Sequence, residues 1–152
     1  MKLFKMSVVC LCFASLFSCN QQQPAQTQTD MKYKNEVIEN MMTRRSIRNY
    51  KEGAVARETM DEILNCGINA PSGMNRQSWE VRVIDNPETI ARFKSLLVAS
   101  NPETKAEAVE GCFRGAPTLV FVANDPSYDF SPIDCGLLSE NIMLSAWSLG
   151  VG

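Results

Sequence analysis

The chain has 152 residues, a length typical of one domain. Its 15 basic and 17 acidic side chains give a net charge of −2, and the absence of a basic excess argues against a nucleic acid partner. The sequence contains no histidine, which excludes a Ser-His-Asp triad, a Cys-His pair and a His-ligated zinc. Chemistry without an imidazole favours a binding module or an enzyme that takes its reactivity from an organic cofactor.

Residues 1–18 have the pattern of a bacterial export signal. Lys2 and Lys5 precede an apolar stretch that is too short to span a bilayer but has the length of a signal-peptide core. The stretch ends in LFSC at residues 16–19, which resembles a lipobox with Cys19 as the lipidated first residue of the mature chain. The alternative is an ordinary cleavage site before a chance cysteine. We expect a lipoprotein-type signal peptide and an anchor in the cell envelope, on the periplasmic or outer face, through Cys19.

Residues 19–31 are polar and almost free of apolar side chains, so they cannot bury a core and predict a flexible tether. The folded domain is then expected over residues 32–152. This domain contains three widely spaced cysteines without a CxxC motif, which indicates neither a disulfide framework nor a zinc site. Each of them, Cys66, Cys112 and Cys135, is expected to be a small buried apolar residue, although one disulfide stays possible in an oxidising compartment.

Helices and strands alternate in the predicted domain. Apolar periodicity predicts helices over 35–43, 57–66 and 90–97 and a short charged helix over 103–110. The alternation in WEVRVI, residues 79–84, predicts a strand with one open face. The continuous apolar run at 119–122 predicts a central strand that is covered on both faces.

The last helix, over residues 133–149, is the clearest. Ser131 is its expected N-cap, Pro132 suits its first position, and the charge of Asp134 meets the helix dipole. Gly150 is the expected C-cap. The helix is apolar on nearly all sides, which indicates a core helix or part of a subunit interface. Because two predicted strands are too few for an independent sheet, we expect the sequence to be a fragment.

A first candidate site is RRSIRNY at residues 44–50, where three arginines occur within five residues. Arginine is costly to bury without a partner. In an extended segment, Arg44, Ser46 and Arg48 share one side, and two guanidinium groups with a hydroxyl are donors that suit a phosphate dianion. The alternative is a solvated basic patch.

A second candidate site is APSGMNRQSWE at residues 70–80, a loop between a helix and a strand. Gly73 lets the backbone approach a ligand closely. The loop is dense in donors that suit a heterocycle rich in amide and carbonyl groups, and the alternative is a polar turn without a ligand. These donors are Ser72, Asn75, Arg76 and Gln77.

The two motifs in this order, TRRSIRNY and then APSGMNRQSW before a strand, resemble the flavin-dependent nitroreductase family. Ala116-Pro117 before the apolar strand and Asp134-Cys135-Gly136 at the start of the last helix extend the resemblance over residues 35–152. The resemblance implies an α+β, nitroreductase-like three-layer fold. Its central, mainly antiparallel sheet is flanked by helices, and an intertwined homodimer holds FMN at the interface.

The resemblance also implies the residues that bind the cofactor. Residues matching the first motif would hold the FMN phosphate and ribityl chain: Arg44, Arg45, Ser46 and Arg48. Residues of the other subunit would lie along the flavin: Pro71, Ser72, Gly73 and Asn75, with Gln77 close by. Lys105 is a further candidate near flavin N1/O2, where a positive charge stabilises the anionic reduced flavin.

Two departures from the family pattern are visible. Ser78 stands where the family often has a proline. Family members continue past the Leu149-Gly150 pair with a flavin-contacting loop, another strand and a tail on the partner subunit. We therefore expect the C-terminal part of the domain to be missing from this sequence.

The resemblance predicts an FMN-dependent oxidoreductase. It would pass hydride or electrons from NAD(P)H or another donor, through flavin N5, to nitroaromatic, quinone-like or other small acceptors. No catalytic side chain and no metal is expected, since the flavin supplies the chemistry. The alternatives are a lipid-anchored flavin-binding protein without turnover and an anion-binding envelope lipoprotein unrelated to flavin.

Overall fold

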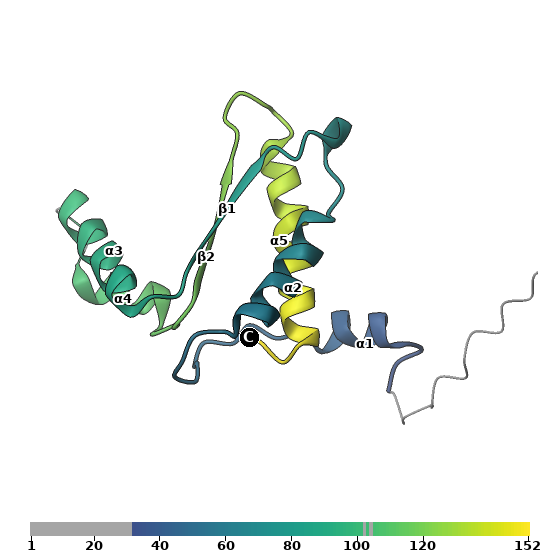
Figure 1. The fold of residues 1–152 in the computed structure, drawn as a ribbon, viewed down its shortest axis with the longest axis horizontal. Helices are drawn as coiled ribbons and strands as arrows, with labels where there is room; N and C mark the ends of the chain where they lie inside the picture. Colours follow the sequence, from purple (N-terminus) through teal and green to yellow (C-terminus); the bar gives the residue numbers. More distant parts are fainter. Residues whose placement is uncertain (1–31, 102, 104) are drawn as a thin grey trace, which may run out of the picture. The chain divides into compact units, whose positions relative to one another are not determined.

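The computed structural model describes residues 32–101, 103 and 105–152, so the predicted signal peptide, Cys19 and the tether lie outside the described residues. Figure 1 shows the elements, which follow one another in the order α1 (Glu36–Thr43), α2 (Arg57–Ile68), η1 (Gly73–Asn75), β1 (Trp79–Ile84), α3 (Pro87–Ser100), α4 (Ala106–Phe113), β2 (Leu119–Asn124) and α5 (Ser131–Ser148). Within these described ranges, no helix is both long and apolar enough to cross a membrane.

Most predicted elements are confirmed, and two helices begin at side chains that explain their start. Asn35 accepts a hydrogen bond from the Ile38 N–H at 3.0 Å, and Asn86 accepts one from the Thr89 N–H at 2.9 Å, as N-cap residues do. The charged helix predicted over 103–110 begins later, because Lys105 is extended and caps α4 with its carbonyl oxygen. The 3-10 turn η1 was not predicted.

The core forms where α2 packs on α5, with Ile63 1% exposed and Leu138 fully buried. Gly67 makes the close approach of the two helices possible. A Cβ atom at this position would lie 2.6 Å from Cγ1 of Ile142. A neighbouring hydrogen bond also joins the helices, since Asn141 Nδ2 donates to the Cys66 carbonyl at 3.1 Å. Any larger residue at Gly67 therefore has to displace the Ile142 side chain.

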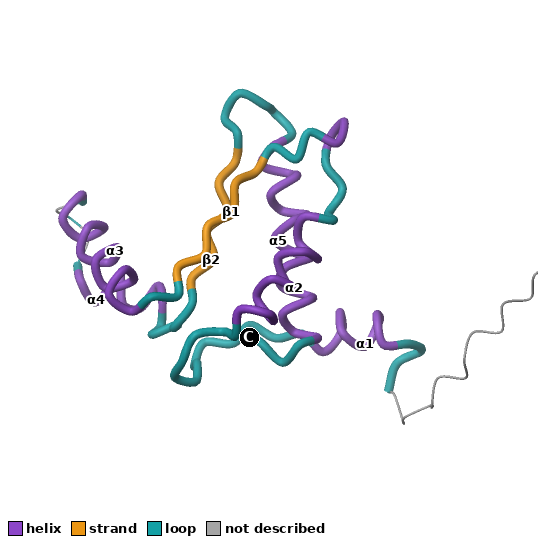
Figure 2. Tube along the Cα trace, in the orientation of Figure 1, coloured by secondary structure: helices purple, strands orange, loops and turns teal. Residues whose placement is uncertain are grey.

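The two strands form an antiparallel ladder in which Val81 lies opposite Val122 and Val83 opposite Val120 (Figure 2). Glu80 and Arg82 are exposed, which confirms the open face predicted for β1. On the other strand Phe121 meets Phe93 of α3 at 4.9 Å between ring centroids. The prediction of a fully covered β2 is only partly confirmed. Its Leu119 is buried, whereas the next three residues are half-buried because β1 is the one strand paired with it among the described residues.

The start of α5 differs from the prediction. Ser131 does not cap the helix: Phe130 occupies the N-cap position and makes no side-chain capping hydrogen bond. The Ser131 hydroxyl is fully buried and donates instead to the Ser78 carbonyl, while it accepts the Asp125 N–H at 2.8 Å. A hydroxyl at the start of a helix can form hydrogen bonds with a neighbouring loop instead of capping its own helix. No local pattern in the sequence distinguishes the two cases.

The end of α5 follows the prediction, and Gly150 has the left-handed φ of +73° that this position needs. Gly150 N–H donates to the Trp147 carbonyl and Val151 N–H to the Ala146 carbonyl, which is the hydrogen-bond pattern of a Schellman motif.

The cysteine prediction is partly wrong. Cys66 and Cys112 are exposed and Cys135 is half-buried, so the first two do not serve as core residues. All three are free thiols in the structure. Cys66 follows the buried Ile63 by three residues, so it borders the buried side of α2 and is nevertheless exposed.

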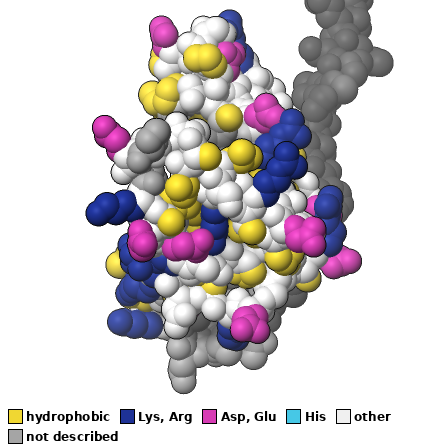
Figure 3. Space-filling view, turned by 90° about the vertical axis from the view of Figure 1, so that its left-hand side faces the viewer, with side chains coloured by type: hydrophobic (Ala, Val, Ile, Leu, Met, Phe, Trp, Pro, Cys, Tyr) yellow, Lys and Arg dark blue, Asp and Glu magenta, His cyan; other side chains and the backbone are white. Residues whose placement is uncertain are grey.

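Charged side chains of both signs are mixed with apolar ones on the surface that Figure 3 shows. Several large apolar side chains are also exposed on α1 and α5. On α1, Val37 is 63%, Met41 56% and Met42 54% exposed, and on α5 Ile133 is 60% exposed. Leu137 and Met143 add to the open apolar surface of α5. Helix α5 is apolar on nearly all sides, so one of its sides packs in the core and another leaves apolar side chains exposed.

Candidate functional site

The first cluster, residues 44–50, begins where α1 ends and lies beside the C-terminal end of α5. Two hydrogen bonds fix this placement: Asn40 Nδ2 donates to the Leu144 carbonyl at 2.9 Å, and Trp147 Nε1 donates to Thr43 Oγ1 at 3.1 Å. Arg44 is the C-cap of α1 with φ −51° and ψ 136°, so the chain leaves the helix in an extended direction at this residue. The cluster is thereby attached to α5 through the last turns of α1.

Five members of the first cluster line a cavity of about 340 Å³, namely Arg44, Arg45, Ser46, Ile47 and Tyr50. Arg44, Arg45 and Ser46 meet Trp147 of α5 and Met60 of α2 around it. Arg48 is not among the lining residues, and its Nη1 is 3.4 Å from the Ser46 carbonyl. The structure therefore brings Arg44, Arg45 and Ser46 together and leaves Arg48 to one side.

The charges of the first cluster stay available. Among the described residues, the ion pairs join Arg57 to Asp61, Arg82 to Glu80 and Lys94 to Glu110, so no carboxylate neutralises an arginine of the cluster. Within the described residues, Arg45 Nη1 donates to the carbonyl oxygens of Arg44 at 2.8 Å and Met42 at 2.9 Å. Unpaired guanidinium groups beside a cavity are an arrangement that attracts an anion.

The second cluster, residues 71–77, is a tight turn with an unusual backbone. Met74, Asn75 and Gln77 have φ values of 52°, 54° and 49°, in the left-handed region that residues other than glycine seldom adopt. The turn is closed by the Gln77 N–H donating to Ser72 Oγ at 3.0 Å and by the Asn75 N–H donating to the Ser72 carbonyl at 3.0 Å. The side chains of Asn75 and Gln77 are exposed, so their amides face outward and can meet a ligand.

The second cluster is attached to the start of α5 through a buried carboxylate. Asp134, which is 2% exposed, accepts the Gly73 N–H at Oδ1 over 3.0 Å and the Ser78 hydroxyl at Oδ2 over 3.2 Å. Sequence reasoning assigned Asp134 only a charge near the helix dipole. Its partners lie 61 and 56 residues away along the chain, and no local signal in the sequence predicts such a contact.

Tyr128 covers the second cluster from the loop that follows β2. Its hydroxyl is buried and has no hydrogen-bond partner within residues 32–101, 103 and 105–152. A Cβ atom at Gly73 would collide with this hydroxyl and would lie 3.4 Å from the ring carbon Cζ. The Arg76 guanidinium sits 4.5 Å from the ring centroid of Tyr128. Gly73 is thus needed for packing against Tyr128, a constraint that adds to the approach of a ligand.

Asp125 is the first residue of this loop, and hydrogen bonds favour its charged form. The Ser127 hydroxyl donates to Asp125 Oδ1 at 2.6 Å and the Ser127 N–H donates to the same oxygen at 2.8 Å. These bonds, with a smaller contribution from the charge of Arg76, lower the pKa of Asp125 below its ordinary value. The Asp125 carboxylate therefore stabilises the turn at residues 125–127.

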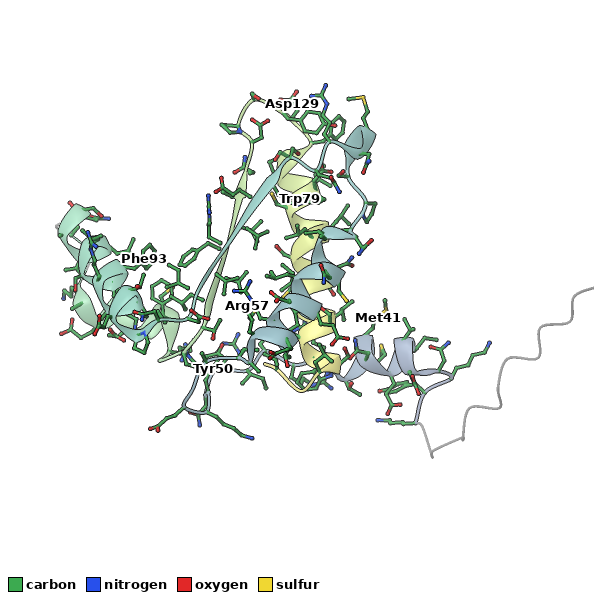
Figure 4. The ribbon with its side chains drawn as sticks, viewed as in Figure 1. Met41, Tyr50, Arg57, Trp79, Phe93 and Asp129 are labelled. Atoms are coloured by element: carbon green, nitrogen blue, oxygen red, sulfur yellow. The ribbon has the colours of Figure 1, made fainter. Side chains whose placement is uncertain are left out.

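The two clusters lie at opposite ends of α5. In Figure 4, Asp129 and Trp79 are near the start of the helix, whereas Tyr50 is near its end. A rise of about 1.5 Å per residue puts Trp147 about 20 Å along α5 from Asp134. The two clusters of one chain are therefore attached to points about 20 Å apart along α5.

Lys105 joins neither cluster. It precedes α4, and its carbonyl accepts the Ala108 and Val109 N–H groups. Helix α4 contacts α3, and among the described residues no ion pair joins Lys105 to either cluster. Within that same part, no group of three or more acidic or thiol side chains is arranged to hold a metal ion.

Comparison with known proteins accounts for the two motifs. The nitroreductase family matches residues 41–152, which include both clusters and all of α5. The chain belongs to the nitroreductase family. An FMN reductase [NAD(P)H] of Bacillus subtilis is 36% identical over 131 residues, which are 78% of this chain and 52% of that protein.

Two solved nitroreductases with bound FMN have the same fold as this nitroreductase-family chain. The structure from Bacteroides fragilis is 31% identical in sequence and has a TM-score of 0.69, and the match covers 76% of this chain and 66% of the Bacteroides chain. The structure from Desulfitobacterium hafniense is 34% identical with a TM-score of 0.67 and the same two coverages of 76% and 66%. The predicted α+β nitroreductase-like fold is thereby confirmed. The chain spans 59% and 64% of the length of two curated archaeal relatives that it matches.

Proposed function

We propose that the protein is an FMN-dependent oxidoreductase that reduces small acceptors with electrons from NAD(P)H or another donor. The observation that supports this most is the pair of clusters held at the two ends of α5. One provides uncompensated guanidinium groups at a cavity, and the other provides outward-facing amides on a tight turn. Relatives named for FMN and NAD(P)H support the same reaction class.

The donor groups of this chain fit the parts of FMN. Arg44, Arg45 and Ser46 would bind the phosphate, because two guanidinium forks and a hydroxyl match the acceptor oxygens of a dianion. The side-chain amides of Asn75 and Gln77 would meet the carbonyl and N–H edge of the flavin ring, since an amide can both donate and accept. Bound FMN would supply the hydride and electron chemistry at its N5 position, so the chain's task is to hold the cofactor and admit flat substrates.

A complete site would need two copies of the chain. The clusters of one chain are separated by most of the length of α5, so the first cluster of one copy would meet the second cluster of another. The exposed apolar side chains of α1 and α5 provide a surface for this second copy, because Val37, Met41 and Ile133 are each more than half exposed. We therefore propose a homodimer whose subunits share two flavin sites.

Turnover separates this proposal from a flavin-binding protein that does not react. We expect the purified protein, supplied with FMN, to show the visible absorption of bound flavin, to bleach with NAD(P)H under anaerobic conditions, and to recover with a nitroaromatic or a quinone. Bound flavin that no reductant bleaches would favour the flavin-binding alternative. Absence of flavin binding would contradict both and favour a different anion as the ligand of the first cluster.

The phosphate contact is tested by replacing Arg44 with alanine. Truncating one partner of a buried charge pair costs about 2–5 kcal/mol, so Arg44→Ala should weaken FMN binding by about 30-fold or more. Riboflavin lacks the phosphate and should lose much less affinity. Arg92→Ala, which removes an exposed arginine from α3, is the matched control and should change neither affinity. Equal losses for FMN and riboflavin in fluorescence titrations would place Arg44 away from the phosphate.

We further propose that the protein is anchored to the cell envelope by lipid on Cys19. The support is the LFSC sequence at residues 16–19 and the polar segment after it. Cys19→Ala should leave a precursor or soluble form and abolish partition with membranes, which fractionation and mass determination of the N-terminus would measure. A Cys19→Ala protein that is cleaved and still partitions with membranes as the wild type does would contradict the anchor.

A further inference from the structure

We propose that Asp134 is a positioning residue that holds residues 72–78 in the conformation in which they would meet the flavin. This inference rests on the proposed function, because it assigns the segment to the flavin site. Asp134 would not touch the cofactor or the substrate. It would act on the second cluster through the Gly73 N–H and the Ser78 hydroxyl.

The backbone of residues 72–78 is strained. Three of the four non-glycine residues with positive φ among the described residues lie here, namely Met74, Asn75 and Gln77. Such conformations are unfavourable for residues with a Cβ atom, and they persist where surrounding contacts over-determine them. The left-handed residues lie between Gly73 and Ser78, so the contacts that impose this shape have to hold the turn at both ends.

The contacts that hold the turn at both ends come from α5. Bonds inside the turn, such as the Gln77 N–H to Ser72 Oγ, move with the turn and cannot fix it in space. Asp134 bonds to Gly73 at one end and to Ser78 at the other, and it belongs to a helix packed on α2. Ser131, one turn earlier on α5, adds a hydrogen bond to the Ser78 carbonyl. One rigid helix therefore holds both ends of the turn.

Among the described residues, the Asp134 carboxylate bonds only to this segment. An acidic residue in the first turn of a helix can accept N–H groups of that turn, as a capping residue does. In the described part of the chain, both oxygens of Asp134 bond instead to the neighbouring segment, and the side chain is almost fully buried. A buried carboxylate without these two partners would be costly, so the carboxylate and the turn each require the other.

The test compares Asp134→Ala and Asp134→Asn with the wild-type chain. Asparagine preserves the geometry, since its Oδ1 can accept from Gly73 and its Nδ2 can donate to Ser78 Oγ. Asp129→Ala is the control, because Asp129 is an exposed acid in the loop just before α5. Two readouts are measured: amide hydrogen exchange of the 71–79 segment without FMN, and the Kd for FMN.

We expect Asp134→Ala to speed exchange in the segment about tenfold and to raise the Kd for FMN about tenfold, as loss of charge-assisted hydrogen bonds does. Asp134→Asn should restore most of both, and Asp129→Ala should change neither. Ser78→Ala removes one of the two bonds and should give a smaller change in the same direction, which keeps the test decisive if Asp134→Ala does not fold.

Three results would overturn the inference. One is unchanged exchange in Asp134→Ala, and another is faster exchange with an unchanged Kd for FMN. The third is an equal rise of exchange throughout α2 and α5 that asparagine does not correct, since this would indicate a general loss of structure. A wild-type chain that binds no FMN, while Asp134→Ala still speeds exchange in the segment, would refute the proposed function and leave the hold of Asp134 on the turn supported.

Discussion

The packing of α5 on α2 is the constraint on which the candidate site depends. Gly67 allows the two helices to approach until Ile142 fills the space that a side chain would occupy. Because a packed helix is stiff, this contact fixes the direction of α5 and therefore the separation of everything attached to its ends. Asp134 holds the second cluster at the start of α5 by a hydrogen bond, and Trp147 holds the end of α1, and with it the first cluster, at the other end of α5. The length of α5 therefore sets the distance between the two clusters.

The two clusters are built by opposite means. In the first, the arginines lack ion-pair partners within the described residues, and their charge stays available at a cavity wall. In the second, hydrogen bonds and a buried carboxylate fix the backbone, and only exposed amide side chains are left for a ligand. A guanidinium group can bind a phosphate from a flexible side chain. Amide side chains that bind a flat ring are placed more precisely when the backbone that carries them is fixed. The division matches the roles we propose for the two motifs.

Local patterns in the sequence predicted most of the fold and none of its long-range polar contacts. Apolar periodicity predicted α2, and Gly150 marked the end of α5, because both signals depend on neighbours in the chain. Ser131 was predicted to cap α5, but its hydroxyl donates a hydrogen bond to the Ser78 carbonyl instead, because the fold brings that carbonyl within reach. Cys66 was expected in the core and is exposed. The motifs named the cluster residues, but their placement at opposite ends of α5 depends on packing that no motif contains.

Mixed dimers test whether one flavin site needs clusters from two copies of the chain. One subunit would contain Arg44→Ala and the other Gly73→Ala, whose Cβ collides with the Tyr128 hydroxyl. Two different affinity tags would isolate dimers that contain one of each, and FMN would be titrated into them. If the sites are shared, each mixed dimer has one intact pair of clusters and binds one FMN, while both parent dimers bind FMN weakly. Mixed dimers that bind FMN as weakly as the parents would show that each site is built from a single chain and would contradict the account.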